Sequence, residues 1–99
     1  MVVLVRLNEG VSPKDYERWV LESYVPAVLE LPSVSDWRNH RVTGLLGSDG
    51  GPPHDYVVTL EVADLERLGE DMGGGRMRAL LSELHGYAQV TQLMAERFV

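Results

Sequence analysis

The order of apolar and polar residues predicts a strand at the start of the chain and a helix directly after it. The run Val2–Leu7 is almost continuously apolar and rich in β-branched side chains, which is typical of a central strand buried on both faces. Ser12, Pro13 and Asp15 then supply a capping oxygen, a residue suited to the first helical position and a negative charge in the first turn. We therefore expect a helix to begin here.

The predicted first helix carries its apolar residues on one stripe. At helical spacing, the stripe consists of Tyr16, Trp19, Val20, Ala27, Val28 and Leu31. Charged residues lie mostly away from it, so we expect the stripe to pack on a sheet. Pro26 lies inside the pattern, where it removes one backbone hydrogen bond and crowds the carbonyl of Glu22. The sequence predicts a kink or an early break at Pro26, and Pro32 ends the segment.

The middle of the chain predicts two strands joined by a long turn. Residues 34–43 form the second strand, in which Trp37 is the only large apolar side chain among polar and charged ones. So polar a strand belongs at the edge of a sheet. Residues 44–53 contain four glycines and two prolines, enough to reverse the chain. Apolar side chains then alternate over residues 54–62, which predicts a third, half-buried strand.

A second helical region follows and is interrupted by three glycines. Asp64 can cap its first part, whose apolar residues keep helical spacing as far as Met72. The triplet Gly73, Gly74 and Gly75 costs about 3 kcal/mol of helix propensity relative to alanine. The sequence predicts a short helix, a glycine hinge and a second helix ended by Gly86, followed by a last strand over residues 89–98. The reason for the triplet is not evident from the sequence.

This order of elements points to one α+β domain over residues 1–99. Strand, helix, strand, strand, helix, strand is the split βαβ order of ferredoxin-like folds, in which the helices cover one face of an antiparallel sheet. The strands keep apolar residues on both faces, such as Val3 and Val5 on one and Val2 and Leu4 on the other. We therefore expect a second copy of the chain to cover the bare face, which makes the protein a homodimer.

Charge and composition narrow the class of protein. The net charge is −6, and the basic residues, eight arginines and Lys14, are scattered among acids, so nucleic acid is not an expected partner. The absence of cysteine removes disulfides, zinc-thiolate sites and thiol nucleophiles, and fits a reducing compartment. The apolar start is too short for a signal peptide, and no run approaches the ~20 apolar residues of a membrane span. A cytoplasmic location with no membrane contact is the expectation.

His54 and Tyr56 are candidate catalytic residues near the start of the third strand. A histidine can act as a general acid or base near neutral pH, and His54 lies beside the glycine-rich loop, where its side chain could reach the mouth of a cavity. The alternative is a loop histidine with no role. Tyr56 alternates with Val58 and Leu60 towards a buried face, so its hydroxyl either needs a partner in the core or serves proton transfer at a pocket.

The predicted edge strand offers a second candidate site. By strand alternation His40 shares one face with Arg38, while Trp37, Asn39 and Arg41 share the other. These side chains could bind an anionic or aromatic substrate. The alternative is that they are solvated residues of an edge strand, where charge discourages aggregation.

Arg6 and Asn8 are polar residues at the end of the apolar first strand. Facing a cavity, they could bind a carboxylate or carbonyl group; otherwise Arg6 pairs with an acid such as Glu61. His54 and Asp55 are adjacent on a strand and point to opposite faces, and the histidine spacings suit no metal site. No metal or cofactor is therefore expected, while a haem held through one histidine stays open.

Several stretches together resemble a known family. They are the first strand, the segment 16–19 leading to Val25-Pro26, the sequence Leu-Pro-Ser-Val at 31–34, and above all Thr-Gly-Leu-Leu-Gly-Ser-Asp-Gly at 43–50 followed by Asp-Tyr at 55–56. With these features the chain resembles the RedY-like proteins, the family that includes HapK, a branch of the dimeric α/β-barrel superfamily. The likeness covers nearly the whole chain.

The resemblance implies a ferredoxin-like monomer whose sheet faces that of a second copy; many relatives have a ligand cavity between sheet and helices. It also implies a place in pigment or antibiotic biosynthesis, since RedY-like proteins accompany pathways to pyrrole-containing pigments and other specialised metabolites. We expect a cofactor-independent tailoring enzyme of monooxygenase, cyclase or dehydratase type acting on a small aromatic substrate. In it His54 or His40 is the base, Tyr56 the proton donor or anchor, and Trp37 and Trp19 the aromatic walls. The alternative is a non-catalytic ligand carrier or a helper that stabilises another pathway enzyme.

Overall fold

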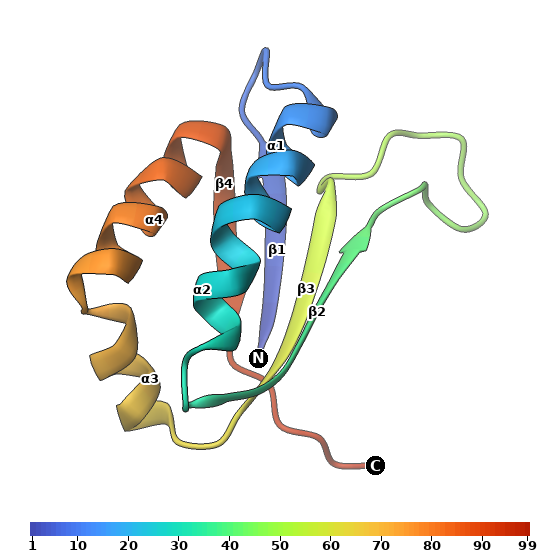
Figure 1. Ribbon diagram of the computed structural model, residues 1–99. Coiled ribbons are helices and arrows are strands. Elements are labelled where there is room, and N and C mark those ends of the chain that lie inside the picture. The colour runs from blue at the N-terminus through green and yellow to red at the C-terminus, as the bar shows by residue number, and fades with distance from the viewer.

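A four-stranded antiparallel sheet with helices on one face makes up the structure, a computed structural model that describes residues 1–99 (Figure 1). In chain order the elements are β1 (Val2–Leu7), α1 (Pro13–Trp19), the π-helical turn η1 (Val20–Tyr24), α2 (Val25–Leu29), β2 (Val34–Arg41), β3 (Tyr56–Val62), α3 (Leu65–Met72), α4 (Gly75–Tyr87) and β4 (Ala88–Leu93). The strand order is β2-β3-β1-β4, so β1 is central and β2 is an edge strand, both as predicted. The predicted α+β ferredoxin-like fold is confirmed.

Alternation along β1 divides its side chains between the two faces of the sheet. Val5, which is 2% exposed, pairs with Tyr56 of β3 and Val90 of β4, and all three side chains pack beneath the helices. Val2 and Leu4 therefore lie on the opposite face. Since the molecule measures only 17 Å along its shortest axis, one layer of helices covers one face and nothing in the chain covers the other (Figure 1).

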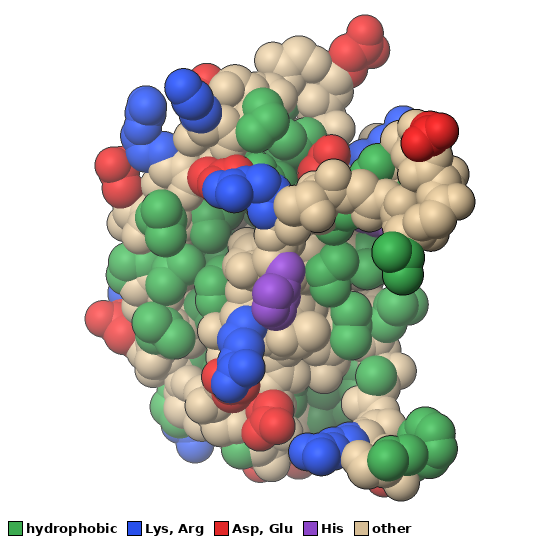
Figure 2. Space-filling model, turned by 90° about the vertical axis from the view of Figure 1, so that its right-hand side faces the viewer, with side chains coloured by type: hydrophobic (Ala, Val, Ile, Leu, Met, Phe, Trp, Pro, Cys, Tyr) green, Lys and Arg blue, Asp and Glu red, His purple; other side chains and the backbone are tan.

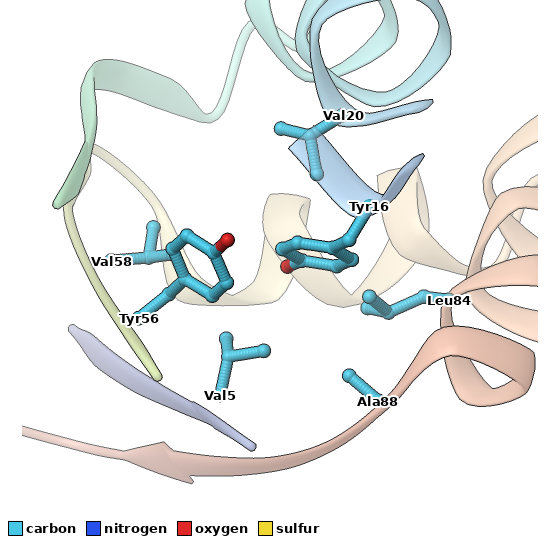
Figure 3. Close-up of a cluster of buried hydrophobic side chains, with 7 residues drawn as sticks. All are labelled: Val5, Tyr16, Val20, Tyr56, Val58, Leu84 and Ala88. Atoms are coloured by element: carbon cyan, nitrogen blue, oxygen red, sulfur yellow. The ribbon is translucent and has the colours of Figure 1, made fainter. Parts of the chain in front are cut away.

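Two groups of buried apolar side chains hold the helices on the sheet. The larger group consists of Val5, Tyr16, Val20, Tyr56, Val58, Leu84 and Ala88 (Figure 3). The smaller group consists of Ala27, Val28, Met77 and Leu80, from α2 and α4. Between helix and sheet, the rings of Tyr16 and Tyr56 lie next to each other, with centroids 4.9 Å apart (Figure 3). The predicted apolar stripe of the first helix thus packs on the sheet as expected.

The early break predicted at Pro26 does not occur. The helical path continues from α1 through η1 into α2, and Pro26 lies in the first turn of α2. The amide of Val25 donates to the carbonyl of Val20, five residues back, which is the hydrogen bond of a π-helix. This wider turn inserts one residue directly before the proline. It gives the proline ring room that a regular α-helix lacks, so the helix continues.

The glycine hinge in the second helical region is confirmed. The Asp64 side chain accepts a hydrogen bond of 3.2 Å from the amide of Arg67 and caps α3, as predicted. Gly73 ends α3 and Gly74 precedes α4, with φ angles of −81° and −66° that any residue can adopt. The helix end predicted at Gly86 is wrong, since α4 continues through Gly86 to Tyr87 and only Ala88 has extended backbone.

Three strand boundaries also differ from the sequence prediction. The ladder between β2 and β3 ends at the pair Arg41 and Tyr56, so β2 stops short of residue 43 and β3 begins after residue 54. The last strand spans Ala88–Leu93 and not 89–98. Its only neighbour is β1, and the ladder between them ends at the pair Val2 and Leu93. The residues after Leu93 have no strand to pair with, and all six are exposed.

Candidate functional site

A cavity lies between the sheet and the helices. Its volume is about 90 Å³, and sixteen of its eighteen lining residues are hydrophobic. All four strands form its floor and the helices form its roof. Trp37 of β2 and Tyr24 of η1 both line it, with ring centroids 6.3 Å apart. The two polar lining residues are Asn39 and Gln92. We call this space the core cavity; an apolar chamber with few polar groups is the usual form of a small-molecule site.

A second, more open pocket adjoins the core cavity on the side of the edge strand. Its volume is about 260 Å³, and it shares four wall residues with the core cavity: Tyr16, Val20, Trp37 and Asn39. Its remaining walls include the polar side chains of Glu17, Arg41 and Tyr56. We call it the outer pocket. The two spaces thus lie next to each other, and only the outer pocket is lined by charged side chains.

Glu17, Arg41 and Tyr56 form one hydrogen-bonded group at the outer pocket. The hydroxyl of Tyr56 donates to Oε2 of Glu17 at 2.7 Å, and Nε of Arg41 donates to the same oxygen at 2.9 Å. Nη2 of Arg41 donates to the other carboxylate oxygen, so the ion pair is bidentate. We call this group the carboxylate cluster. It joins α1 to the ends of β2 and β3.

The charges of the carboxylate cluster follow from these contacts. The hydrogen bonds from Arg41 and Tyr56 lower the pKa of Glu17 from 4.5 to about 2, so it is a carboxylate at neutral pH. Burial, followed by the adjacent carboxylate, raises the pKa of Tyr56 to about 12, so it remains a neutral donor. The pKa of Arg41 is raised by its hydrogen bonds to Glu17. In the free protein at neutral pH, Glu17 therefore stays ionised and Tyr56 stays neutral, and the hydrogen bonds of the cluster fix their positions.

Asn39 is the polar residue common to both spaces. It lies on β2 with its side chain on the helix-facing side, between Trp37 and Arg41 in alternation. Its Oδ1 atom is buried and has no hydrogen-bond partner. Among residues 1–99, it is the only buried side-chain nitrogen or oxygen atom without a hydrogen-bond partner.

The aromatic residues of the chain converge beside the cavity. Tyr16 contacts the rings of Tyr56, Trp19 and Tyr87, and Trp19 leads through Tyr24 to Trp37. Every tryptophan and tyrosine of the sequence belongs to this connected set, with neighbouring centroids 4.9–6.3 Å apart. Three of these rings, Tyr16, Tyr24 and Trp37, line the core cavity, which favours flat ring systems as occupants.

The predicted site residues fall into two groups. Tyr56 and Trp37 line the cavity or its opening, and the predicted sharing of one face by Trp37, Asn39 and Arg41 is confirmed. Trp19 packs behind the cavity, and its indole N–H donates to Glu83 at 3.3 Å. It supports the aromatic wall without lining the cavity.

Two predicted positions at the edge of the sheet lie away from the cavity. His40 and Arg38 are exposed on the opposite face of β2, where Arg38 pairs with Asp36 at 3.2 Å. Nδ1 of His40 lies 3.3 Å from the carbonyl of Val57. Figure 2, which views the molecule from the β2 side, shows a band of charged and histidine side chains with hydrophobic patches on either side.

The other predicted residues lie at the ends of strands. His54 is half-buried in the loop before β3 and lines neither the core cavity nor the outer pocket. Arg6 and Asn8 line a shallow surface pocket at the end of β1, where the amide of Asn8 donates to the carbonyl of His85 at 3.0 Å. Neither histidine therefore lines the core cavity or the outer pocket, to which Tyr56 belongs.

Sequence reasoning missed Glu17. It lies on the polar side of the first helix, like the other charged residues there, and its partners are 24 and 39 residues away in the sequence. No local pattern distinguishes it from a solvated glutamate. The described residues contain no group of three or more histidine, aspartate or glutamate side chains suited to a metal ion, and no helix combines the length and apolar character of a membrane span.

Comparison with known families extends this picture. Residues 1–98 match the family described as REDY-like protein HapK. The chain belongs to the HapK family. No curated protein matches it. Membership confirms the resemblance carried by the strands and by the stretch at residues 43–50.

Solved structures of HapK-like shape agree with this family. HapK from Hahella chejuensis has a TM-score of 0.73 and 19% identity, over 99% of this chain and 95% of that one. SnoaB from Streptomyces nogalater, a cofactor-independent oxygenase, has a TM-score of 0.76 and 12% identity, over 99% and 91%. A dimeric ferredoxin-like protein of unknown function from Thermobifida fusca has a TM-score of 0.66 and 18% identity, over 93% and 87%. At these low sequence identities, the structural similarity establishes a shared fold and nothing more.

Proposed function

We propose that this HapK-family protein binds a small aromatic substrate in the core cavity and transforms it without a cofactor, as a tailoring enzyme of specialised metabolism. The observation that carries the proposal is the shape and lining of the paired spaces: an apolar, partly aromatic chamber opening past Asn39 onto the carboxylate cluster. Such a site suits a ligand with a flat apolar body and one polar end. The oxygenase SnoaB, which shares the fold, is described as cofactor-independent.

Each part of the cluster has a role in this proposal. Arg41 presents a cation at the opening that can bind a carbonyl or phenolate oxygen of the substrate. Tyr56 is a neutral hydroxyl donor held in place by Glu17. A substrate oxygen that takes Arg41 away from Glu17 removes the main cause of the lowered pKa, so the carboxylate becomes a better base when substrate is bound.

The test is turnover of pyrrole, indole and quinol compounds in air, followed by mass spectrometry. We expect Glu17→Gln and Tyr56→Phe to lower turnover by about 10²-fold, in the range for loss of one acid or base group. Tyr87→Phe is the matched control, because its hydroxyl has no hydrogen bond and no place in the cavity. Wild-type turnover in the Glu17 and Tyr56 variants would contradict the assignment.

The same assay decides the roles predicted for the two histidines. His54→Ala and His40→Ala remove the candidate bases outside the cavity. Equal turnover in both variants and in the wild-type protein would end those roles. A loss in either one would mean that substrate reaches the loop before β3 or the opposite face of the sheet.

A non-catalytic function is the second candidate, and one observation favours it. The pKa of Glu17 is about 2 and that of Tyr56 is about 12, so neither group exchanges a proton near neutral pH in the free protein. A carrier or a helper that stabilises a pathway enzyme needs the cavity and no such exchange. Binding of the test compounds with no turnover in any variant would support this candidate.

A homodimer is part of the proposal. On the bare face, Val2, Leu4, Val57 and Leu93 form an apolar strip across β3, β1 and β4, because Leu4 pairs with Val57 and Val2 with Leu93. Relatives of this fold are described as dimeric. A second copy of the sheet would remove the strip from water.

Light scattering tests this assembly. At micromolar concentration we expect twice the mass of one chain, and Val57→Lys should produce monomers by placing a charge in the strip. Leu29→Lys is the control, because Leu29 is 63% exposed and belongs to α2, on the other side of the sheet. A monomeric wild-type protein would contradict the homodimer.

A further inference from the structure

No donor of the chain forms a hydrogen bond with the buried Oδ1 atom of Asn39. At the outer pocket, the hydroxyl of Tyr56 and two N–H groups of Arg41 donate to Glu17. Gln92, the other polar residue of the core cavity, belongs to β4, and two strands separate β4 from β2 in the sheet. The oxygen is therefore free to accept a hydrogen bond from a molecule that occupies the cavity.

Leaving a buried oxygen unsatisfied destabilises the free protein. A buried carbonyl without a hydrogen bond keeps the full cost of its removal from water, whereas an apolar residue at the same place would avoid that cost. The backbone of Asn39 pairs with Val58 in the β2–β3 ladder, and alternation directs the side chain to the helices. A side chain held this way is prepared for a hydrogen-bond donor from a ligand.

We propose that Asn39 is the specificity-determining residue of the cavity, and that its Oδ1 accepts a hydrogen bond from an N–H or O–H group on a flat aromatic ligand. The rings of that ligand lie against Trp37 and Tyr24, which line the same space. The ligand class is accordingly an N–H heteroarene or a phenol. An aromatic compound with only acceptor groups would place its own lone pairs against Oδ1 of Asn39 and would bind less tightly. This inference rests on the proposed binding of an aromatic substrate in the core cavity.

Paired probes that differ by one methyl group test the inference. Indole is compared with 1-methylindole and 2-naphthol with 2-methoxynaphthalene, each titrated into the full chain and followed by NMR at the side-chain N–H signals of Trp37 and Asn39. We expect the wild-type protein to bind the donor member about tenfold more tightly, as one hydrogen bond in a buried site provides. The two pairs separate N–H ligands from O–H ligands, and a preference in either pair supports the inference.

Variants connect the preference to Asn39. Asn39→Leu has a similar volume without the oxygen, and we expect it to bind both members of each pair equally and to unfold at a higher temperature than the wild-type protein. Asn39→Val, which suits a strand, replaces it if the leucine variant does not fold. Gln89→Leu is the control, because it removes an amide of β4 that lines neither the core cavity nor the outer pocket, and it should keep the wild-type preference.

The outcomes separate this inference from the proposed function. Binding of both members without preference, preference for the methylated member, or an unchanged preference in Asn39→Leu would overturn the role of Asn39 and leave the cavity as a binding site. Failure of all four probes to bind up to their solubility limits would contradict both the role of Asn39 and the proposed function.

Discussion

Replacing Tyr56 by phenylalanine removes one hydroxyl and leaves the ring in place. Tyr56 is 4% exposed, and its ring keeps the contact with Tyr16 whether or not the hydroxyl is present. What is lost is the 2.7 Å hydrogen bond to Glu17, a bond to an ionised group. Bonds of this kind contribute about 2 kcal/mol to stability. We therefore expect Tyr56→Phe to lower the free energy of unfolding by about this amount and the melting temperature by roughly 8–16 °C for a domain of this size.

The effect should depend on pH in a defined direction. In the folded chain the pKa of Glu17 is about 2, against 4.5 without its partners. As the pH falls, the unfolded chain therefore takes up a proton at Glu17 before the folded chain does. The stabilisation is complete above about pH 4.5 and is lost as the pH falls towards 2. The difference between the wild-type protein and Tyr56→Phe should shrink in the same window.

Urea unfolding at pH 7, 4 and 2.5, followed by circular dichroism, measures both effects. Tyr87→Phe is the control for loss of a tyrosine hydroxyl and should unfold like the wild-type protein at each pH. The reasoning is refuted if Tyr56→Phe unfolds at the wild-type urea concentration at pH 7. It is also refuted if the difference is as large at pH 2.5 as at pH 7.

Three further substitutions test the fold by urea unfolding. Ser33 is 1% exposed and its hydroxyl donates to Asp71 at 2.7 Å, so Ser33→Ala should lower the free energy of unfolding by about 1–2 kcal/mol; no change would mean the contact is absent in solution. Gly75→Ala should raise it by about 0.5–1 kcal/mol, since Gly75 is helical and an added Cβ meets nothing within 4 Å; a loss would show that the hinge needs glycine. Gly10→Ala should lower it by about 1 kcal/mol, because Gly10 has a φ of +84°; a neutral result would place this turn in another conformation.

Most of the fold could be predicted from local sequence patterns. The continuous apolar run of β1, the polar character of β2 and the capping role of Asp64 each depend on residues close together in sequence, and each is confirmed. The end of β4 could not be predicted from local sequence, because it depends on its pairing with β1, which ends at Val2 and Leu93. An alternating pattern shows what could be a strand, and the neighbouring strand decides how much of it is one.

The candidate site was less accessible to such reasoning. Trp37 and Tyr56 were identifiable because an aromatic residue on an alternating strand has one inward face. Glu17 was not, because its importance comes from Arg41 and Tyr56, which reach it only in the folded chain. His40 and His54 were predicted as site residues because a histidine can act as an acid or base, but this property says nothing about where the side chain lies, and neither lines the cavity.

The π-helical turn connects the sequence of the first helix to the shape of the cavity. Tyr16, Val20, Tyr24 and Val28 are spaced four apart, and all four line the core cavity. In a straight α-helix each step of four residues advances by about 40°, so the first and last would lie about 120° apart. The one residue inserted by the π turn removes about 100° of this rotation and leaves about 20°.

Pro26 favours this arrangement because it has no amide hydrogen to donate to Glu22, the bond that a regular α-helix would form there. Widening the turn in front of Pro26 therefore breaks one α-helical hydrogen bond fewer than it would if position 26 had an amide hydrogen. At 3.6 residues per turn Tyr24 lies about 80° and Val28 about 120° round the helix from Tyr16, and the inserted residue turns both back towards it. Tyr24 thereby lines the wall, 6.3 Å from Trp37. The same proline that predicts an interruption of the helix thus helps to align one side of the space in which we place the ligand.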